Sequence, residues 1–201
     1  MRRRLLIPLL VLLVCSVSSR SLPASGSPYT TVVVANRQSP ASLHVAAHYA
    51  RKRHIPAANI VYVDVKPDPA VAPDVFQRAV VEPVWQRMSA LEDRITHVAV
   101  MLGVPYRVGG YSATTVLAFG GADKMPTLNP FYNLPMGFSS RVDYLQQPMV
   151  LVTMLTAANV DDALALIDRS VAADCERPSG TLYLSKGAGP RGVRRSQYDQ
   201  V

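Results

Sequence analysis

The chain has 201 residues, enough for one domain with a sizeable core, and 49% of them are hydrophobic while 17% are charged. This composition excludes an intrinsically disordered protein. The formal net charge is +7, but Arg2, Arg3, Arg4 and Arg20 lie in the first twenty residues, and the rest of the chain has 17 basic and 14 acidic residues. Because a nucleic-acid-binding domain needs a basic face on its folded part, we expect no nucleic-acid partner.

Residues 1–26 have the layout of a secretory signal peptide. The basic MRRR is followed by the apolar run LLIPLLVLLVCSV and then by the small and polar residues SSRSLPASGS. The apolar run is shorter than the roughly 20 residues of a membrane-spanning helix. We therefore expect a secreted or periplasmic protein that meets the membrane only through its signal peptide during export. An uncleaved anchor is the alternative. Lipid attachment at Cys15 is disfavoured because Val14, and not a small residue, precedes it.

Removal of the signal peptide would leave Cys175 as the only cysteine, so the domain has no internal disulfide and depends on its core. A nucleophilic role for this thiol is disfavoured, because Asp174 and Glu176 flank it and neighbouring carboxylates raise a thiol's pKa. We expect an incidental or structural cysteine and no catalytic residue in this chain.

The first part of the expected domain is a strand–helix–strand unit. Residues 31–35 form an apolar, β-branched run of the kind found in strands buried on both faces. Ser39 can cap a helix with Pro40 in its first turn, and this helix ends near Pro56. Residues 59–65 return as a strand, which a right-handed crossover makes parallel to the first.

The helix of this unit is expected to have a buried face and a solvated one. The buried face would hold Leu43, Ala46, Ala47 and Ala50, and the solvated face His44, His48, Arg51 and Lys52. Two histidines four residues apart could share a metal ion. The metalloprotease form of this spacing has a glutamate where this chain has Val45, so we predict no metal site.

Further strands and helices follow. Asp74 is expected to cap a helix running to about Glu92, which Pro83 should kink or split. Residues 96–102 are expected to form the third strand. A loop-rich excursion at 106–148 comes next, in which residues 114–119 form a short strand or a helical turn. Such long excursions are often functional.

Residues 149–155 are expected to form the fourth strand, and Asn159 to cap a helix that ends near Cys175. Residues 181–185 would be the fifth strand. The resulting fold class is α/β, a three-layer sandwich with a mostly parallel sheet in caspase-like or Rossmann-like order, formed by one domain over residues 27–201. Because no helix follows to cover the last strand, we expect the front part of a longer domain.

Polar residues lie where the expected strands end: Asn36, Ser39, Asp64, Arg107, Thr153 and Lys186. Ligands of open α/β sheets bind beyond the carboxyl ends of the strands, so these residues are the predicted binding site. The alternative is capping and turn formation. No cofactor is predicted, because the loop NRQSP lacks the glycines of a dinucleotide site and no helix follows the tail GAGPRG.

Several motifs then carry a resemblance. They are N-x-x-S at Asn36, Y-A-x-x-R-x-I-P-x-x-N at Tyr49, G-V-P-Y-R at Gly103, N-P-F-Y-N at Asn129 and L-V-T-x-L with A-L-x-L-I-D-R-S over residues 151–170. In this combination the chain resembles the N-terminal half of a family of secreted bacterial proteins of unknown function. Members tend to have an arginine at the position of Met154 and an acidic residue in the stretch corresponding to 113–121.

More distantly, the order of elements is similar to the front half of gingipain-type cysteine peptidases, which have a caspase-like fold. The segment around Asp168 is the closest local match. This resemblance implies that the catalytic histidine and cysteine lie later in the chain, and His97 and Cys175 are not in matching contexts. Two hypotheses follow from the sequence: an exported binding or surface-associated module, and the non-catalytic front half of a caspase-like cysteine hydrolase.

Overall fold

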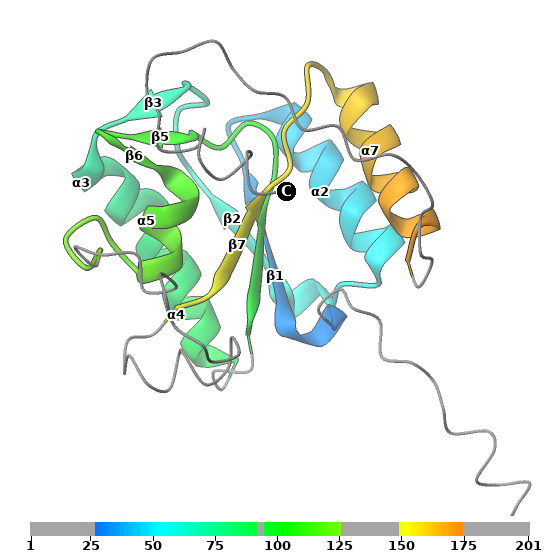
Figure 1. The fold of residues 1–201 in the computed structure, drawn as a ribbon, viewed down its shortest axis with the longest axis horizontal. Coiled ribbons are helices and arrows are strands. Elements are labelled where there is room, and N and C mark those ends of the chain that lie inside the picture. Colours follow the sequence, from blue (N-terminus) through cyan, green and yellow to red (C-terminus); the bar gives the residue numbers. More distant parts are fainter. Residues whose placement is uncertain (1–26, 92–94, 126–148, 175–201) are drawn as a thin grey trace, which may run out of the picture.

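The computed structural model describes residues 27–91, 95–125 and 149–174, which form a three-layer α/β sandwich (Figure 1). Its central sheet has four parallel strands in the order β2-β1-β4-β7. They are β1 (Thr31–Asn36), β2 (Ile60–Val63), β4 (His97–Val100) and β7 (Leu151–Met154). The predicted fold class is therefore confirmed. The predicted fifth strand lies outside the described residues.

Strand β1 lies in the centre of the sheet, and all six of its residues are buried. Its side chains alternate between two cores. Val32 and Val34 belong to the core on one face, while Val33 and Ala35 belong to the core on the other. An uninterrupted run of small β-branched residues suits this position because neither face of the strand contacts water.

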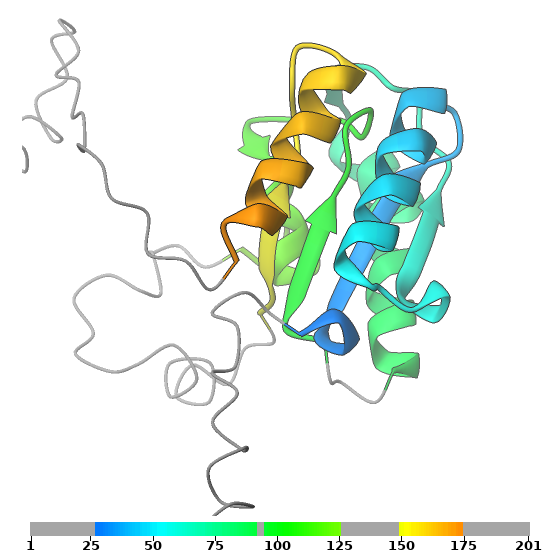
Figure 2. The ribbon, with the colours of Figure 1, turned by 90° about the vertical axis from the view of Figure 1, so that its right-hand side faces the viewer.

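One face of the sheet, the α2/α7 face, is covered by α2 (Pro40–Arg53) and α7 (Val160–Ala172), which lie side by side (Figure 2). Both helices begin at the predicted caps. The Ser39 hydroxyl accepts a hydrogen bond from the Ser42 N–H at 3.2 Å, and Asn159 Oδ1 accepts one from the Asp162 N–H at 2.8 Å. These caps satisfy N–H groups of the first turn that have no partner within the helix.

The predicted faces of α2 are partly wrong. Ser42, Val45 and Ala46 are its buried residues, whereas Leu43 and Ala47 are exposed. The difference arises because α2 packs against both β1 and α7, which turns its contact face. His48 was expected in solvent, but its side chain is only 12% exposed because it faces α7.

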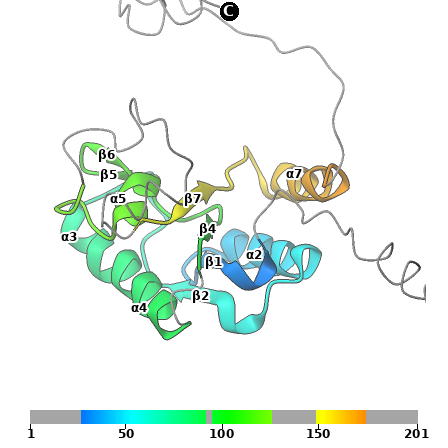
Figure 3. The same cartoon turned by 60° about the horizontal axis from the view of Figure 1, so that its bottom comes forward.

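The opposite face, the α4/α5 face, is covered by α3 (Pro73–Phe76), a π turn (Gln77–Val81), α4 (Glu82–Ala90) and α5 (Ala113–Phe119) (Figure 3). Pro83 was expected to kink or split this helix; the backbone instead stays helical through Pro83, and a π turn lies directly before α4. A regular α-helix requires each N–H to donate to the carbonyl of the preceding turn, and proline has no N–H to donate. Trp85, the only tryptophan of the chain, joins α4 to α5 by donating from Nε1 to the Leu117 carbonyl at 2.9 Å.

The predicted cap at Asp74 is wrong. The helix begins two residues earlier, with Ala72 as N-cap and Pro73 in the first turn. Asp74 lies in that first turn and pairs with Arg78 at 2.9 Å. Proline favours the first helical position because its fixed φ suits a helix and its missing N–H would have no partner there.

The expected excursion contains regular structure in its described part. A second sheet has the order β3-β5-β6, formed by β3 (Ala70–Val71), β5 (Arg107–Val108) and β6 (Tyr111–Ser112), and α5 follows it. Residues 114–119, predicted as a strand or a helical turn, are helical. Residues 126–148 lie outside the described part. None of the helices in the described ranges is long and apolar enough to cross a membrane.

Candidate functional site

Three of the six predicted site residues meet where the strands of the main sheet end. Asn36 closes β1 and has no exposed surface. Its Nδ2 donates to the carbonyls of Val65 and Gly103, both at 2.7 Å. Its Oδ1 accepts from the N–H groups of Gln38 at 3.1 Å and Val65 at 3.3 Å. The amide therefore holds together three chain segments and has no group left for a ligand.

The neighbours of Asn36 are also occupied by the protein. Ser39 caps α2 and lies against Gly103, where an added Cβ would come within 2.4 Å of the Ser39 hydroxyl oxygen. Asp64 pairs with Arg37 at 3.1 Å, and the Arg37 guanidinium lies 5.4 Å from the centre of the Tyr62 ring. Capping and turn formation, the alternative interpretation, account for all of these contacts.

The other predicted residues lie elsewhere. Arg107 is exposed on β5 in the second sheet. Thr153 lies in the middle of β7, paired with Ala99, and faces α7. Lys186 lies outside the described residues. The structure therefore brings Asn36, Ser39 and Asp64 together and leaves a binding role for the six residues a prediction.

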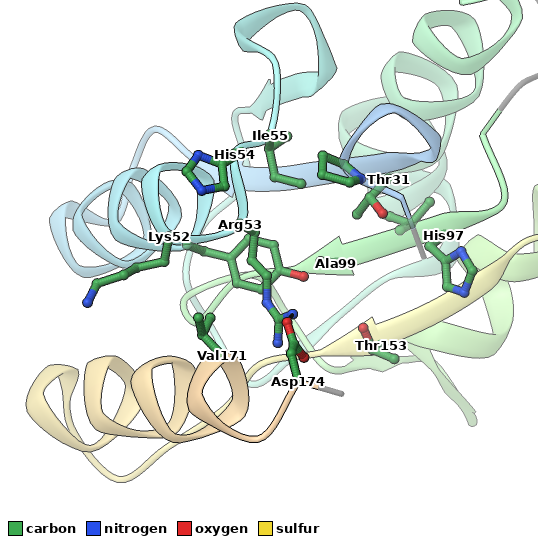
Figure 4. Close-up of a pocket in the computed structure, with 13 residues that line it drawn as sticks. Thr31, Lys52, Arg53, His54, Ile55, His97, Ala99, Thr153, Val171 and Asp174 are labelled. Carbon is green, nitrogen blue, oxygen red and sulfur yellow. Dashed lines mark hydrogen bonds and ion pairs between the residues drawn. The ribbon is translucent and has the colours of Figure 1, made fainter. Parts of the chain in front are cut away.

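A cavity of about 480 Å³ lies at the other end of the sheet, where the strands begin and the helices of the α2/α7 face end (Figure 4). The sheet forms its floor, and the last turns of α2 and α7 form its walls. Its lining residues are Pro28, Thr31, Tyr49, Lys52, Arg53, His54, Ile55, His97, Val98, Ala99, Thr153, Val171 and Asp174. Of the five predicted site residues that the structure describes, Thr153 is the one in this cavity.

Arg53 forms a fixed wall between the two helices. Its Nη1 makes an ion pair with Asp174, and its Nη2 donates to the Ser170 hydroxyl at 3.0 Å. Figure 4 shows the Arg53 side chain extending from α2 toward Asp174 at the end of α7. The guanidinium therefore joins the two helix ends, and its charge is matched by a carboxylate.

Two titratable side chains of the cavity are held in their neutral forms. Burial raises the pKa of Tyr49 above its ordinary value, although the nearby Arg53 acts in the opposite direction. Burial lowers the pKa of His97, and the His97 Nδ1 is 2.7 Å from the Thr96 hydroxyl. The cavity therefore offers a phenol and a neutral imidazole, both able to exchange hydrogen bonds with a ligand.

His54 borders the same cavity in an unusual backbone conformation. It ends α2 with φ 56° and ψ 35°, the only positive φ among the non-glycine residues that the structure describes. Its N–H donates to the Ala50 carbonyl, as in a left-handed helix cap. Glycine or asparagine usually occupies this position, and such strained residues occur preferentially at binding sites.

A histidine–carboxylate pair lies on the outer side of these helices. The His48 Nε2 and the Lys52 Nζ each lie 2.9 Å from Asp168 Oδ1, and these hydrogen bonds, that of Lys52 first, lower the pKa of Asp168. A carboxylate orients the imidazole of a catalytic triad in this way. Here the other nitrogen of His48, Nδ1, is 3.0 Å from Arg51 Nη2, so an arginine lies where a nucleophile would have to lie. The pair therefore acts as a clamp between α2 and α7.

No family model matches the chain, and no curated protein or solved structure compared with it gives a significant match. The described residues also contain no cluster of three or more metal-ligating side chains. Function is therefore argued from the geometry of the site itself.

Asn36, Ser39 and Asp64 lie at the opposite end of the sheet from this cavity. One signal was present: Tyr49 and Arg53 lie four residues apart on one helix, directly before Ile55, and the motif that carries the resemblance contains all three. Residues that are four positions apart on a helix lie on the same face. The residues of α7 that close the cavity have no comparable pattern in the sequence.

Proposed function

We propose that this chain is an exported α/β domain that binds a small molecule in the cavity between α2, α7 and the sheet. The observation that supports the proposal most is the cavity itself. A volume of about 480 Å³ lies within the range of ligand pockets in proteins, roughly 300–1,000 Å³. Apolar side chains such as Ile55, Ala99 and Val171 are combined there with a few polar groups, as in typical ligand sites.

The cavity is also held open by fixed structure. The Arg53–Asp174 pair joins the helix ends above it, and the His48–Asp168 pair joins the same two helices on their outer side. Its floor consists of paired strands, β4 and β7. A ligand would therefore enter a preformed site, which avoids much of the entropic cost of ordering on binding.

The test compares two variants with a tryptophan on the same face of β7. Thr153 lines the cavity, whereas Leu151, two residues earlier and also exposed, does not. Ligand-detected NMR with a library of fragment-sized molecules should find binders of the wild type with Kd values of about 1 mM or lower. Thr153→Trp fills the cavity and should abolish this binding, while Leu151→Trp should retain it.

Two results would contradict the proposal. One is a wild-type protein that binds no fragment, and the other is binding that survives Thr153→Trp. If circular dichroism shows that Thr153→Trp does not fold, the site is tested instead by the NMR signals of the His97 ring in the wild-type protein. They should shift with bound fragment, and unchanged signals in the presence of a fragment that binds would count against this site.

The front half of a caspase-like cysteine hydrolase is the second proposal. The parallel sheet with helices on both faces supports it at the level of fold class alone. The described residues contain no cysteine, and the His48–Asp168 pair has an arginine in place of a nucleophile. This second proposal is of a non-catalytic front half with the catalytic cysteine later in the chain, so Cys175 should react with iodoacetamide no faster than free cysteine at pH 7, and much faster alkylation would contradict it.

A further inference from the structure

We infer that the cavity selects an uncharged ligand carrying hydroxyl or carbonyl groups over anions and cations of the same shape. This inference rests on the proposed small-molecule site and adds the chemical class of its ligand. It follows from the charges that border the cavity and from their partners.

Each strong cation at the cavity already has its own carboxylate. Lys52 pairs with Asp168 at 2.9 Å, and Arg53 pairs with Asp174. Asp174 is the only carboxylate among the described lining residues, so the two kinds of charge are matched there before any ligand enters. An anion would have to compete with Asp174 for Arg53, and a cation would have to compete with Arg53 for Asp174.

The helix ends do not favour an anion either. Both α2 and α7 end at the cavity, and the carboxyl end of a helix carries a partial negative charge. The basic residues in the last turn of α2, namely Arg51, Lys52 and Arg53, offset that charge. The remaining field is therefore small, and an ion entering the cavity would lose its hydration without gaining a new counter-ion.

Among the described lining residues, the groups without a hydrogen-bond partner include three neutral groups and the buried Arg53 Nε, whose charge Asp174 already matches. Among the described residues, none hydrogen-bonds to the Tyr49 hydroxyl or to the hydroxyl of Thr153, and the His97 Nε2 is likewise without a partner. Burial favours the neutral phenol and the neutral imidazole. A hydroxyl or carbonyl group can donate to or accept from such groups, while the apolar side chains contact the rest of the ligand.

The test uses three probes with the same benzyl framework and different charge. Benzyl alcohol is neutral, benzoate is an anion and benzylamine is a cation at pH 8, where histidine side chains carry little charge. Binding to the intact protein is measured by NMR titration, with Thr153→Trp as the filled-cavity control and Leu151→Trp as the matched control. Benzyl alcohol should bind at least about tenfold more tightly than either ion and should lose this binding in Thr153→Trp alone.

The outcomes separate this inference from the proposed function. If fragments bind the cavity but benzoate or benzylamine binds as tightly as benzyl alcohol, the ligand class is wrong and the site stands. The same holds if fragments bind and none of the three probes does. If no fragment binds the wild type, or if binding survives Thr153→Trp, the proposed function itself fails.

Discussion

Asn36 shows how one buried amide can connect distant parts of a chain. It bonds to the backbone of Gln38, Val65 and Gly103, which belong to the loops that follow three neighbouring strands. A buried polar group is stable only when it is hydrogen-bonded, and here every partner is a backbone group. The side chain therefore fixes the end of the sheet.

Asn36→Ala should lower the free energy of unfolding by about 2–4 kcal/mol, because it leaves the buried carbonyl of Val65 and the partly buried carbonyl of Gly103 without this donor. Urea denaturation followed by circular dichroism measures this change. Arg37→Ala is the matched control, since it removes only the exposed pair with Asp64 and the contact with the Tyr62 ring and should cost less than about 1 kcal/mol. Equal effects of the two substitutions would show that Asn36 does not hold the loops together.

The loop after β4 and the start of α2 come close together through two small residues, Gly103 and Ser39. The loop after β4 reaches the start of α2 at Gly103, which has φ +89° and almost touches Ser39. Only glycine adopts such a backbone readily, and only glycine leaves room for the Ser39 cap. The contact therefore sets the position of α2 relative to the sheet.

Gly103→Ala should destabilise the protein by about 2 kcal/mol or more, through backbone strain and through displacement of the Ser39 cap. Gly110→Ala provides the comparison, because Gly110 has no atom within 4 Å of an added Cβ and no positive φ. Its effect should stay within about 0.5 kcal/mol. Thermal unfolding of both variants measures the difference, and a Gly103 variant as stable as the Gly110 variant would argue against the contact.

At the scale of the whole molecule, short sequence patterns were enough to predict the helices and strands. The cavity, in contrast, depends on how these helices and strands are arranged in the complete fold. The burial of β1 and the caps at Ser39 and Asn159 depend on a few adjacent residues, so the sequence was sufficient to find them. The cap at Asp74 was one such local prediction that failed, because Pro73 competes for the first turn. The cavity depends on α2 and α7 becoming neighbours across more than a hundred residues, and no local pattern encodes that.

The same limit explains His48. Its spacing on α2 placed it among charged residues, and an exposed position followed from that pattern. Contact with α7 instead makes Asp168 its partner. Sequence patterns show which residues share a helix face, whereas which other element covers that face is a property of the complete fold.

Export remains a prediction for the whole chain, and it can be tested directly. Expression of residues 1–201 in a bacterium should give a shortened protein, with a new N-terminus after Ser19 or within Ala24–Gly26, as measured by mass spectrometry. Leu9→Arg combined with Leu12→Arg should block this processing, because charges in the apolar run oppose its insertion into the membrane. A wild-type protein that keeps its full mass in the exported fraction would instead indicate an uncleaved anchor.

Trp85 has a practical consequence for studies in solution. Its indole is bonded to Leu117 on the α4/α5 face, with the sheet between it and the cavity on the α2/α7 face. Intrinsic fluorescence of the wild type therefore reports on the half of the molecule that a ligand does not touch. An emission spectrum that stays constant during a titration would be the expected optical result of binding, and the tyrosine signal of Tyr49 would be the informative one.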